Sequence, residues 1–270
     1  MDKLIFNSSM PRSGSELLQV ILHQNPKIYA SPTSPLIEYQ FACRNIFDLP
    51  EVKSQDPNIM ENALVSVYKN IAHGYYDAIT TRPIVIDKSR GWSMLYEMVE
   101  SWNEAPKMIC MVRDLRSVLA SFEKIYRTNR HKNTGPDNFE TLENMTVDER
   151  VDYWLTKVPI GQSLKRLQDL FQKDIYHNIL FIKYEDFCHD PQKQLDKIYD
   201  YIGEERFQHR FNTIQKEVVE DDSHFGIFGK HEVKPKIERP DPSDWSEVLP
   251  IEVSNLVKEN YSWYFDSFGY

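Results

Sequence analysis

The segment from Ser9 to Ser15 has the composition of an anion-binding loop. It reads Ser-Met-Pro-Arg-Ser-Gly-Ser and lies between an apolar run and an amphipathic segment that begins near Glu16. A short loop between a strand and a helix presents unpaired backbone N–H groups and the positive end of the helix dipole. Arg12 adds a fork of charged donors, and Ser13 adds a hydroxyl group. An ordinary turn with a capping serine is the alternative, and the Walker pattern of nucleoside-triphosphate loops is absent.

A second candidate anion site follows the apolar run 108–112. Arg113 comes directly after this run, at the carboxyl end of a predicted strand, where open α/β sheets bind ligands. Ser117 and Ser121 are one turn apart on the helix that is predicted to follow. A capped, exposed helix is the alternative. Two such sites at two strand ends predict a ligand with phosphate groups at two separated positions.

A late basic stretch supplies further positive charge. It contains Lys230, His231, Lys234 and Lys236 and follows an acidic stretch at residues 217–222. A chain of net negative charge that binds a highly anionic ligand needs a local basic patch of this kind. A solvated surface is the alternative for such a run.

Four short apolar runs are the elements that would position these side chains. They cover residues 4–7, 83–86, 108–112 and 178–182, and their continuous apolar character predicts strands that are buried on both faces. Segments with a helical period lie between them, at residues 16–23, 36–47, 58–79, 94–101, 116–126, 148–171 and 191–202. This alternation predicts an α/β protein with a P-loop-like, three-layer fold, in which helices flank a central parallel sheet.

The remainder of the chain predicts a loop and a terminal helix. Glycines and prolines interrupt residues 217–244, which predicts a long ordered loop or lid, with a linker as the alternative. Residues 251–270 resume a helical period and predict a C-terminal helix. Neither an internal repeat nor a dividing linker is evident, so we expect one domain over residues 1–270.

The composition bounds the function classes that the chain can serve. A formal net charge of −9 argues against a general nucleic-acid binder, so any basic site must be local. No apolar run approaches the roughly 18 residues of a membrane span, and the first ten residues lack a signal-peptide pattern. The scattered Cys43, Cys110 and Cys188 suit neither a disulfide framework nor a metal site. We therefore expect a soluble, cytoplasmic chain with no nucleic-acid or membrane partner.

Four segments carry a resemblance to one family of enzymes. In chain order they read MPRSGSELLQVILHQNP, VRDLRSVLASF, FIKYEDFCHDPQKQLDKIYDYIG and VKPKIERPDPSDWSEVLP. The first looks like the 5′-phosphosulfate loop of sulfotransferases, closest to the PRSGTTLL form of the protein-tyrosine sulfotransferase group. The second is similar to their 3′-phosphate element, the third to their YEDL segment, and the fourth to their late lysine-and-tryptophan loop. The matches run from residue 6 to residue 250 in family order.

The resemblance implies a donor and the residues that bind it. The donor of that family is 3′-phosphoadenosine 5′-phosphosulfate (PAPS), which leaves as adenosine 3′,5′-bisphosphate, and no metal is expected. The implied cofactor-binding residues are Arg12, Ser13, Gly14 and Ser15 at the 5′-phosphosulfate, Arg113 and Ser121 at the 3′-phosphate, Tyr184 near the adenine, and Lys230 and Lys234 in the late loop. The implied activity is sulfonate transfer by in-line displacement to a small-molecule or peptide hydroxyl acceptor.

The catalytic assignments combine this resemblance with the chemistry of the transfer. Arg12 is expected at the sulfonate and bridging oxygen, and Lys88 at the charge on the leaving group. The tyrosine-sulfotransferase group has a GEE segment where this chain reads Ala-Ser-Pro-Thr-Ser-Pro, and Arg90 stands in place of the histidine base of cytosolic sulfotransferases. The candidates for the general base are therefore Glu38, then Asp87, then Glu16. A P-loop kinase for a small metabolite or nucleotide, and a non-catalytic nucleotide-binding protein, are the alternative functions.

Overall fold

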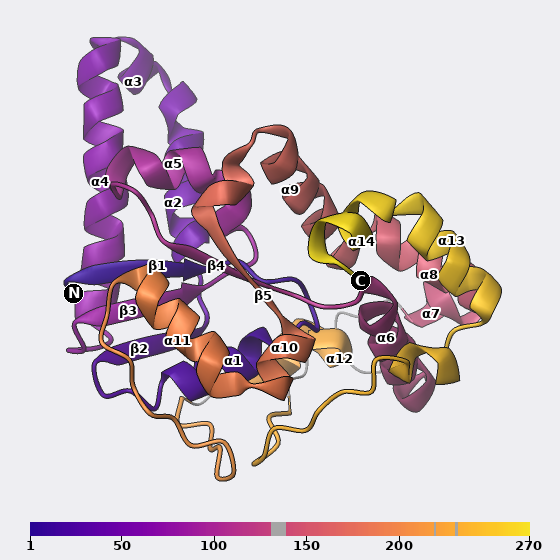
Figure 1. The fold of residues 1–270 in the computed structure, drawn as a ribbon. Coiled ribbons are helices and arrows are strands. Elements are labelled where there is room, and N and C mark those ends of the chain that lie inside the picture. Colours follow the sequence, from indigo (N-terminus) through magenta and orange to yellow (C-terminus); the bar gives the residue numbers. More distant parts are fainter. Residues whose placement is uncertain (131–138, 219, 230–231) are drawn as a thin grey trace.

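A five-stranded parallel sheet forms the centre of the computed structural model, which describes residues 1–130, 139–218, 220–229 and 232–270 (Figure 1). The strand order is β2-β3-β1-β4-β5, and every pairing is parallel. The strands are β1 (Lys3–Asn7), β2 (Ile28–Thr33), β3 (Ile84–Lys88), β4 (Met108–Val112) and β5 (Ile179–Lys183). The chain runs outward from β1 in both directions, so the loops that follow β1 and β4 leave the sheet at its topological switch point, where such sheets bind ligands.

Four of the five strands were predicted, and the fold class is confirmed. The strand that the sequence did not reveal is β2, which contains Pro32 and lies at the edge of the sheet next to β3. A proline cannot donate a ladder hydrogen bond, so it is confined to edges and bulges and weakens the apolar pattern of a strand. The pairing of β2 with β3 is indeed irregular between Ala30 and Thr33.

The strands are buried on both faces, as their apolar runs predicted. Leu4, Phe6 and Val85 belong to one hydrophobic core, whereas Ile5 and Ile86 belong to a second core on the opposite face. This alternation follows from the period of two along a strand. The helices therefore cover the sheet on two sides and complete the three layers.

The second core is covered by two helices that lie far apart in the sequence. These are α1 (Ser15–Leu22) and α11 (Pro191–Ile202), whose apolar residues Leu18 and Ile198 are fully buried there. The first core is covered by helices from the middle and end of the chain. They are α4 (Pro57–Asp77), α5 (Tyr96–Trp102), α6 (Leu115–Asn129), α8 (Val147–Thr156), α9 (Ile160–Gln172), α13 (Ile251–Asn260) and α14 (Ser262–Phe268).

Two predicted helices are each divided in the structure. The segment 148–171 forms α8 and α9 because Pro159, which cannot continue a helix, stands between them. The segment 251–270 forms α13 and α14, which are separated at Tyr261, whose φ of −120° and ψ of 30° are not helical. The described residues of the predicted loop at 217–244 form short helical turns and irregular structure. The helical turns are η4 (Asp222–Phe225), α12 (Gly226–Gly229) and the start of η5 (Asp244–Glu247).

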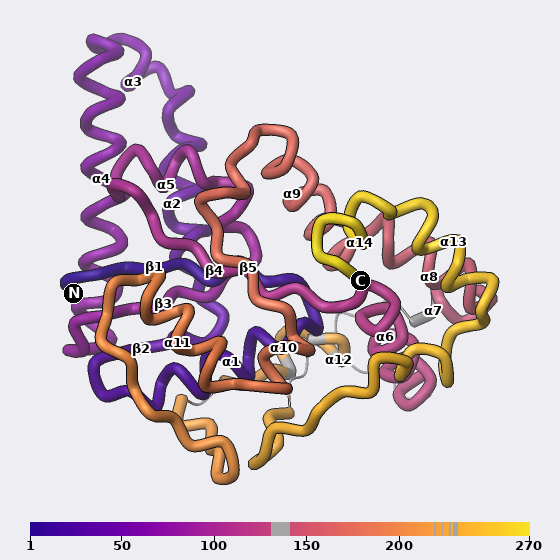
Figure 2. The backbone as a smooth tube through the Cα atoms, viewed as in Figure 1, coloured from indigo at the N-terminus to yellow at the C-terminus, as the bar shows by residue number. Residues whose placement is uncertain are grey.

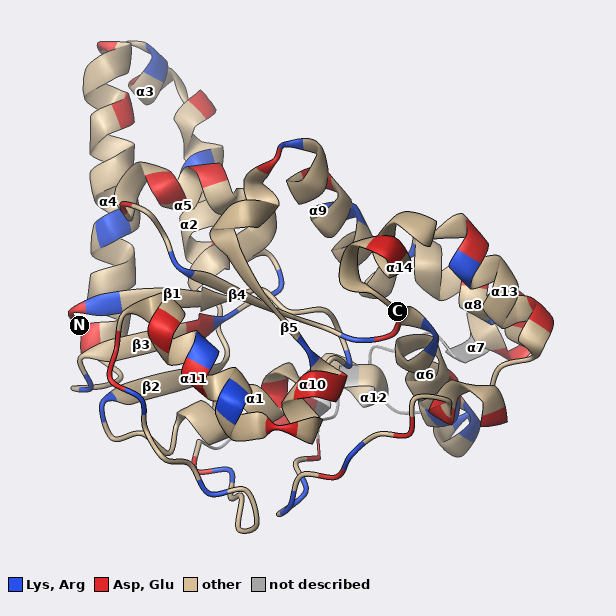
Figure 3. Cartoon of the chain, viewed as in Figure 1, with Lys and Arg blue, Asp and Glu red and all other residues tan. Residues whose placement is uncertain are grey.

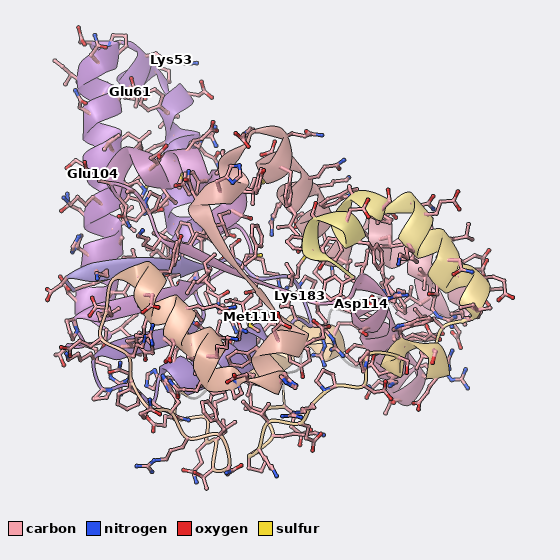
Figure 4. The ribbon with its side chains drawn as sticks, in the orientation of Figure 1. Lys53, Glu61, Glu104, Met111, Asp114 and Lys183 are labelled. Carbon is pink, nitrogen blue, oxygen red and sulfur yellow. The ribbon has the colours of Figure 1, made fainter. Side chains whose placement is uncertain are left out.

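A helical hairpin rises from the sheet beside the main body. It consists of α2 (Leu36–Asn45), α3 (Pro50–Lys53) and α4, and its tip lies far from the sheet in the tube view (Figure 2). Lys53 and Glu61 mark this tip, whereas Asp114 and Lys183 lie near the carboxyl ends of β4 and β5 (Figure 4). Acidic and basic residues are interspersed over the outer helices (Figure 3). None of the helices in the described ranges combines the length and the apolar character that crossing a membrane requires.

Candidate active site

The loop between β1 and α1 is a tight turn that brings its backbone close to a tyrosine ring. Arg12 and Gly14 both have positive φ angles, of 58° and 86°, and Ser13 Oγ donates to the Met10 carbonyl oxygen at 2.6 Å. A Cβ atom on Gly14 would lie 2.5 Å from Cδ2 of Tyr184. Glycine is therefore required at this position for both its conformation and its small size. The turn ends at the first residue of α1, whose N-terminal N–H groups are directed out of the loop.

The two predicted anion elements lie in direct contact. Arg12 Nε donates to Ser121 Oγ at 3.1 Å, and Arg113 Nη1 donates to the Arg12 carbonyl oxygen at 3.3 Å. The Arg113 guanidinium lies 4.7 Å from the centre of the Tyr184 ring. Burial, followed by the positive charge of Arg113, lowers the pKa of Arg12. Two guanidinium groups held this close favour an anion between them.

A small pocket of about 220 Å³ opens beside these residues. It is lined by the loop and by the segment that follows residue 231; the lining residues include Arg12, Gly14, Ser15, Arg113, Tyr184 and Lys234. The ammonium of Lys234 forms an ion pair with Glu238, four residues later in the sequence. Lys230 and His231, also predicted in this basic stretch, lie outside the described residues.

An internal carboxylate occupies part of the Arg113 element. Asp244 accepts hydrogen bonds from Arg113 Nη2 at 2.9 Å and from Ser117 Oγ at 2.6 Å. Arg113 Nε, in contrast, is buried and has no hydrogen-bond partner in the described part of the chain. The guanidinium and the Ser117 hydroxyl are thus arranged around a negative group. Sequence reasoning did not identify Asp244, although it adjoins Trp245, the tryptophan of the late lysine-and-tryptophan loop.

A second carboxylate, Glu16, lies between two lysines. It forms ion pairs with Lys88 and with Lys216 Nζ, the latter at 2.8 Å. Burial raises the pKa of Glu16, but the two lysines more than compensate and the net shift is downward. This carboxylate at the start of α1 is therefore neutralised. Its low pKa makes it a poor general base.

A large cavity of about 660 Å³ lies on the other side of the loop. Ser15, the first residue of α1, lines both the large cavity and the small pocket. The predicted residues Lys88 and Glu38 also line the large cavity, together with Arg90 and Arg166. Ser15 at the helix N-terminus therefore borders both spaces.

Asp87 is separated from this cavity despite its place next to Lys88. Its carboxylate is fully buried, where it accepts hydrogen bonds from the Tyr76 hydroxyl and from Trp92 Nε1, the latter at 2.6 Å. Burial raises its pKa. Asp87 does not line the large cavity, so it fits a structural role that fixes the end of β3 rather than a base for an acceptor. Among the three candidates for the base, Glu38 alone lines the cavity, while Glu16 lines the small pocket.

The positive charge around the loop comes from basic side chains. In ranges 1–130, 139–218, 220–229 and 232–270, no group of three or more His, Cys, Asp or Glu side chains is placed to hold a metal ion. Cations from four separate segments surround the loop instead: Arg12, Lys88, Arg113 and Lys216. The sequence did not single out Lys216 or Arg166, because isolated basic residues in a loop or on a helix carry no motif.

Comparisons with known proteins identify the family. The model of the sulfotransferase domain matches residues 2–268. The chain belongs to the sulfotransferase family. It is therefore a sulfotransferase by family, and the donor of this family is PAPS. The match is to the domain as a whole, so the resemblance to the tyrosine-sulfotransferase group stays a prediction.

Solved sulfotransferase structures share the fold at low sequence identity. The sulfotransferase domain of the curacin biosynthetic pathway has a TM-score of 0.55 at 18% identity and covers 97% of this chain and 98% of its own. The sulfotransferase domain of the Synechococcus PCC 7002 olefin synthase has a TM-score of 0.50 at 19% identity, with 99% and 94% covered. A sulfotransferase from Mycobacterium avium has a TM-score of 0.53 at 13% identity, with 97% and 76% covered. The search of curated proteins found no significant sequence match.

Proposed function

We propose that this sulfotransferase binds PAPS in the small pocket and transfers the sulfonate group to a hydroxyl acceptor in the large cavity. The observation that carries the proposal is the position of Ser15, which lines both spaces at the N-terminus of α1. A group bound at this helix end is reachable from either side. The donor and the acceptor would therefore meet at the positive end of the helix dipole.

The residues around the small pocket fit the donor. Arg12, Ser13, Gly14 and Ser15 would hold the 5′-phosphosulfate, because Arg12, Gly14 and Ser15 line the pocket at the tight turn that precedes the N-terminus of α1. Arg113 and Ser121 would hold the 3′-phosphate, a role that the unpartnered Nε of Arg113 supports. Tyr184 lines the pocket and offers an aromatic face to the adenine.

Two cations are placed to stabilise negative charge during transfer. The bound donor supplies a sulfonate whose departure leaves charge on a phosphate oxygen, so catalysis depends on positioning and charge neutralisation. Arg12 would face this oxygen from the loop, and Lys88 would face it from the end of β3. Lys88 must first release Glu16, and the second ion pair to Lys216 keeps Glu16 neutralised when it does so.

Glu38 is the best placed candidate for the base. It projects from the first turn of α2 into the large cavity that also holds Lys88 and Arg90. A carboxylate that removes the acceptor proton contributes roughly 10²–10⁴-fold in rate. Its position on a regular helix, rather than on a loop, suits such a role.

We further propose that the segment 217–244 acts as a lid in one domain spanning residues 1–270. Phe228 stacks on Phe122 of α6 with ring centres 5.0 Å apart, and Glu220 accepts a hydrogen bond from the Thr33 N–H at 3.1 Å. Residues of this segment line both the small pocket and the large cavity. Their displacement would open both spaces.

A cytoplasmic location is also proposed for this protein. Cys43, Cys110 and Cys188 are all free thiols, and the last two are buried. Free cysteines that are kept as thiols suit a reducing compartment. Fractionation of cells that produce the full-length protein tests the location, and recovery of the protein outside the cytoplasm would contradict it.

Sulfonate transfer to a panel of alcohols, phenols and tyrosine peptides tests the proposed function. We expect at least one acceptor to gain one SO₃ group by mass spectrometry, with equimolar release of adenosine 3′,5′-bisphosphate. Arg12→Ala should lower turnover by more than it weakens donor binding. Stabilisation by ATP–Mg²⁺ but not by adenosine 3′,5′-bisphosphate would favour the kinase alternative, and tight nucleotide binding without any transfer would favour the non-catalytic one.

A further inference from the structure

The large cavity combines an apolar wall with a group of positive charges. Its apolar lining comes from several helices and includes Phe41, Met94, Phe122, Trp154 and Phe228. Its volume of about 660 Å³ is that of a site for a molecule of drug size. Lys88, Arg90 and Arg166 line the same space, where Glu38 is the only lining carboxylate of the described residues.

Arg90 and Arg166 lack ion-pair partners in the part of the chain that the structure describes. Arg90 follows β3, and crowding by protein atoms, followed by the charges of Arg166 and Arg12, lowers its pKa to about 10. Arg166 projects from α9, and its Nε is buried without a hydrogen-bond partner. Burial lowers the pKa of Arg166, and the nearby charge of Glu38 offsets this shift only in part. Lys88, by contrast, is already paired with Glu16.

Guanidinium groups without an ion-pair partner are costly to cover with a neutral ligand. An acceptor that fills the cavity displaces the water that solvates both groups, and among the described residues no carboxylate forms an ion pair with either of them to replace it. An oxyanion on the acceptor would replace that water with charge-assisted hydrogen bonds, which are the strong ones for a guanidinium. The aromatic wall would hold the apolar part of the same molecule.

We infer that the acceptor is an anionic amphiphile: an apolar hydroxyl compound that carries a carboxylate or phosphate, which Arg166 and Arg90 bind. The inference rests on the proposed function, because it names the acceptor class of the same cavity. Arg90 lines the large cavity but also feels the charge of Arg12 in the donor loop, so Arg166 is the residue that separates acceptor recognition from donor binding. Arg166 is thus a specificity residue for the oxyanion.

Matched acceptor pairs test this class directly. The pairs are ω-hydroxydecanoate with its methyl ester, and p-hydroxyphenylpropionate with its methyl ester; ω-hydroxydecyl phosphate distinguishes a phosphate from a carboxylate. We expect the wild-type enzyme to use the anion of at least one pair about tenfold or more better than its ester in kcat/KM. Arg166→Gln should reduce this preference to within about threefold, mainly by raising the KM of the anion, because the lost contact is present in the bound ground state.

A neighbouring lysine provides the matched control. Lys165→Gln removes one positive charge from the exposed side of the same helix and should keep the preference. A merely structural role of Arg166 would lower kcat/KM for the anion and the ester equally, which would overturn the inference. Equal use of both members of each pair by the wild-type enzyme would overturn it as well.

Binding measurements separate a failure of this inference from a failure of the proposed function. Calorimetric titration of each acid, phosphate and ester into the enzyme saturated with adenosine 3′,5′-bisphosphate reports the anion preference without any transfer. Anion binding that is tighter in the wild type than in Arg166→Gln supports the inference, whether or not a sulfonate group is transferred. If such binding is found but no compound receives a sulfonate group, that result contradicts the proposed function alone. Transfer to neutral alcohols or phenols with no preference for anions would contradict the inference alone.

Discussion

Replacing Asp244 by asparagine should tighten the binding of adenosine 3′,5′-bisphosphate. Asp244 accepts from Arg113 Nη2 at 2.9 Å and from Ser117 Oγ at 2.6 Å, in the element that we propose for the 3′-phosphate. A phosphate that takes the same donors must displace this carboxylate or bind beside it. In either case the negative charge of Asp244 opposes the ligand. Asparagine has nearly the same shape and still accepts a hydrogen bond from Ser117.

The size of the effect follows from the short distances. At about 5 Å and an effective dielectric constant of about 20, two unit negative charges repel by about 3 kcal/mol. Two effects reduce this gain: solvent screens the partly exposed Asp244 side chain, and the substitution removes its ion pair with Arg113. We therefore expect the binding free energy to improve by about 1.4 kcal/mol, or about tenfold in Kd. The gain should shrink as the salt concentration rises.

Isothermal titration calorimetry with two ligands measures the effect. Asp244→Asn should tighten the binding of adenosine 3′,5′-bisphosphate and leave that of adenosine 5′-monophosphate nearly unchanged, because the latter has no 3′-phosphate. The control is Glu247→Gln, which removes the same charge from the exposed end of the same short helix. Weaker binding of both ligands to Asp244→Asn would refute the reasoning and would show that Asp244 orients Arg113 instead.

Three further outcomes are expected. Gly14→Ala should weaken donor binding at least tenfold, as measured by calorimetry. The φ of 86° at this position strains alanine, and the new Cβ would meet Tyr184. Unchanged binding would contradict the loop geometry. Lys88→Gln should lower kcat at least tenfold in the transfer assay with little change in donor Kd, and a larger loss in Kd than in kcat would contradict its role. Burial lowers the pKa of His209 to about 4, so the unfolded state binds more protons than the folded state between about pH 6.5 and pH 4. The free energy of unfolding should therefore fall by up to about 3 kcal/mol as the pH drops through this window. Chemical denaturation of the wild type and of His209→Gln checks this, and an equal pH slope in both proteins would count against it.

The sequence predicted the fold because its strands are strongly apolar. The runs that became β1, β3, β4 and β5 are buried on both faces, and such runs are visible without any knowledge of tertiary contacts. The edge strand β2 was missed because Ser31 and Pro32 resemble a loop. The break at Pro159 was overlooked because the helical period continues on both sides of it.

The site was predictable only where its residues lie in a local motif. Arg113 follows β4 directly and Arg12 lies in the loop after β1, so topology brings them together at the switch point. Asp244 and Lys216 reach the site from a long irregular segment, and Arg166 from a helix face. Long-range pairing of such residues depends on tertiary packing, which no local pattern records. For the same reason Asp87 seemed a candidate base, although its side chain points into the core.

A crystal structure with adenosine 3′,5′-bisphosphate tests the central claim most directly. The account predicts the 5′-phosphate at the turn from Arg12 to Ser15 and the 3′-phosphate within hydrogen-bond distance of Arg113, with Asp244 displaced from that guanidinium. The vacated sulfonate position should face the large cavity beside Lys88. A nucleotide bound elsewhere, or a 3′-phosphate that does not contact Arg113, would contradict the account.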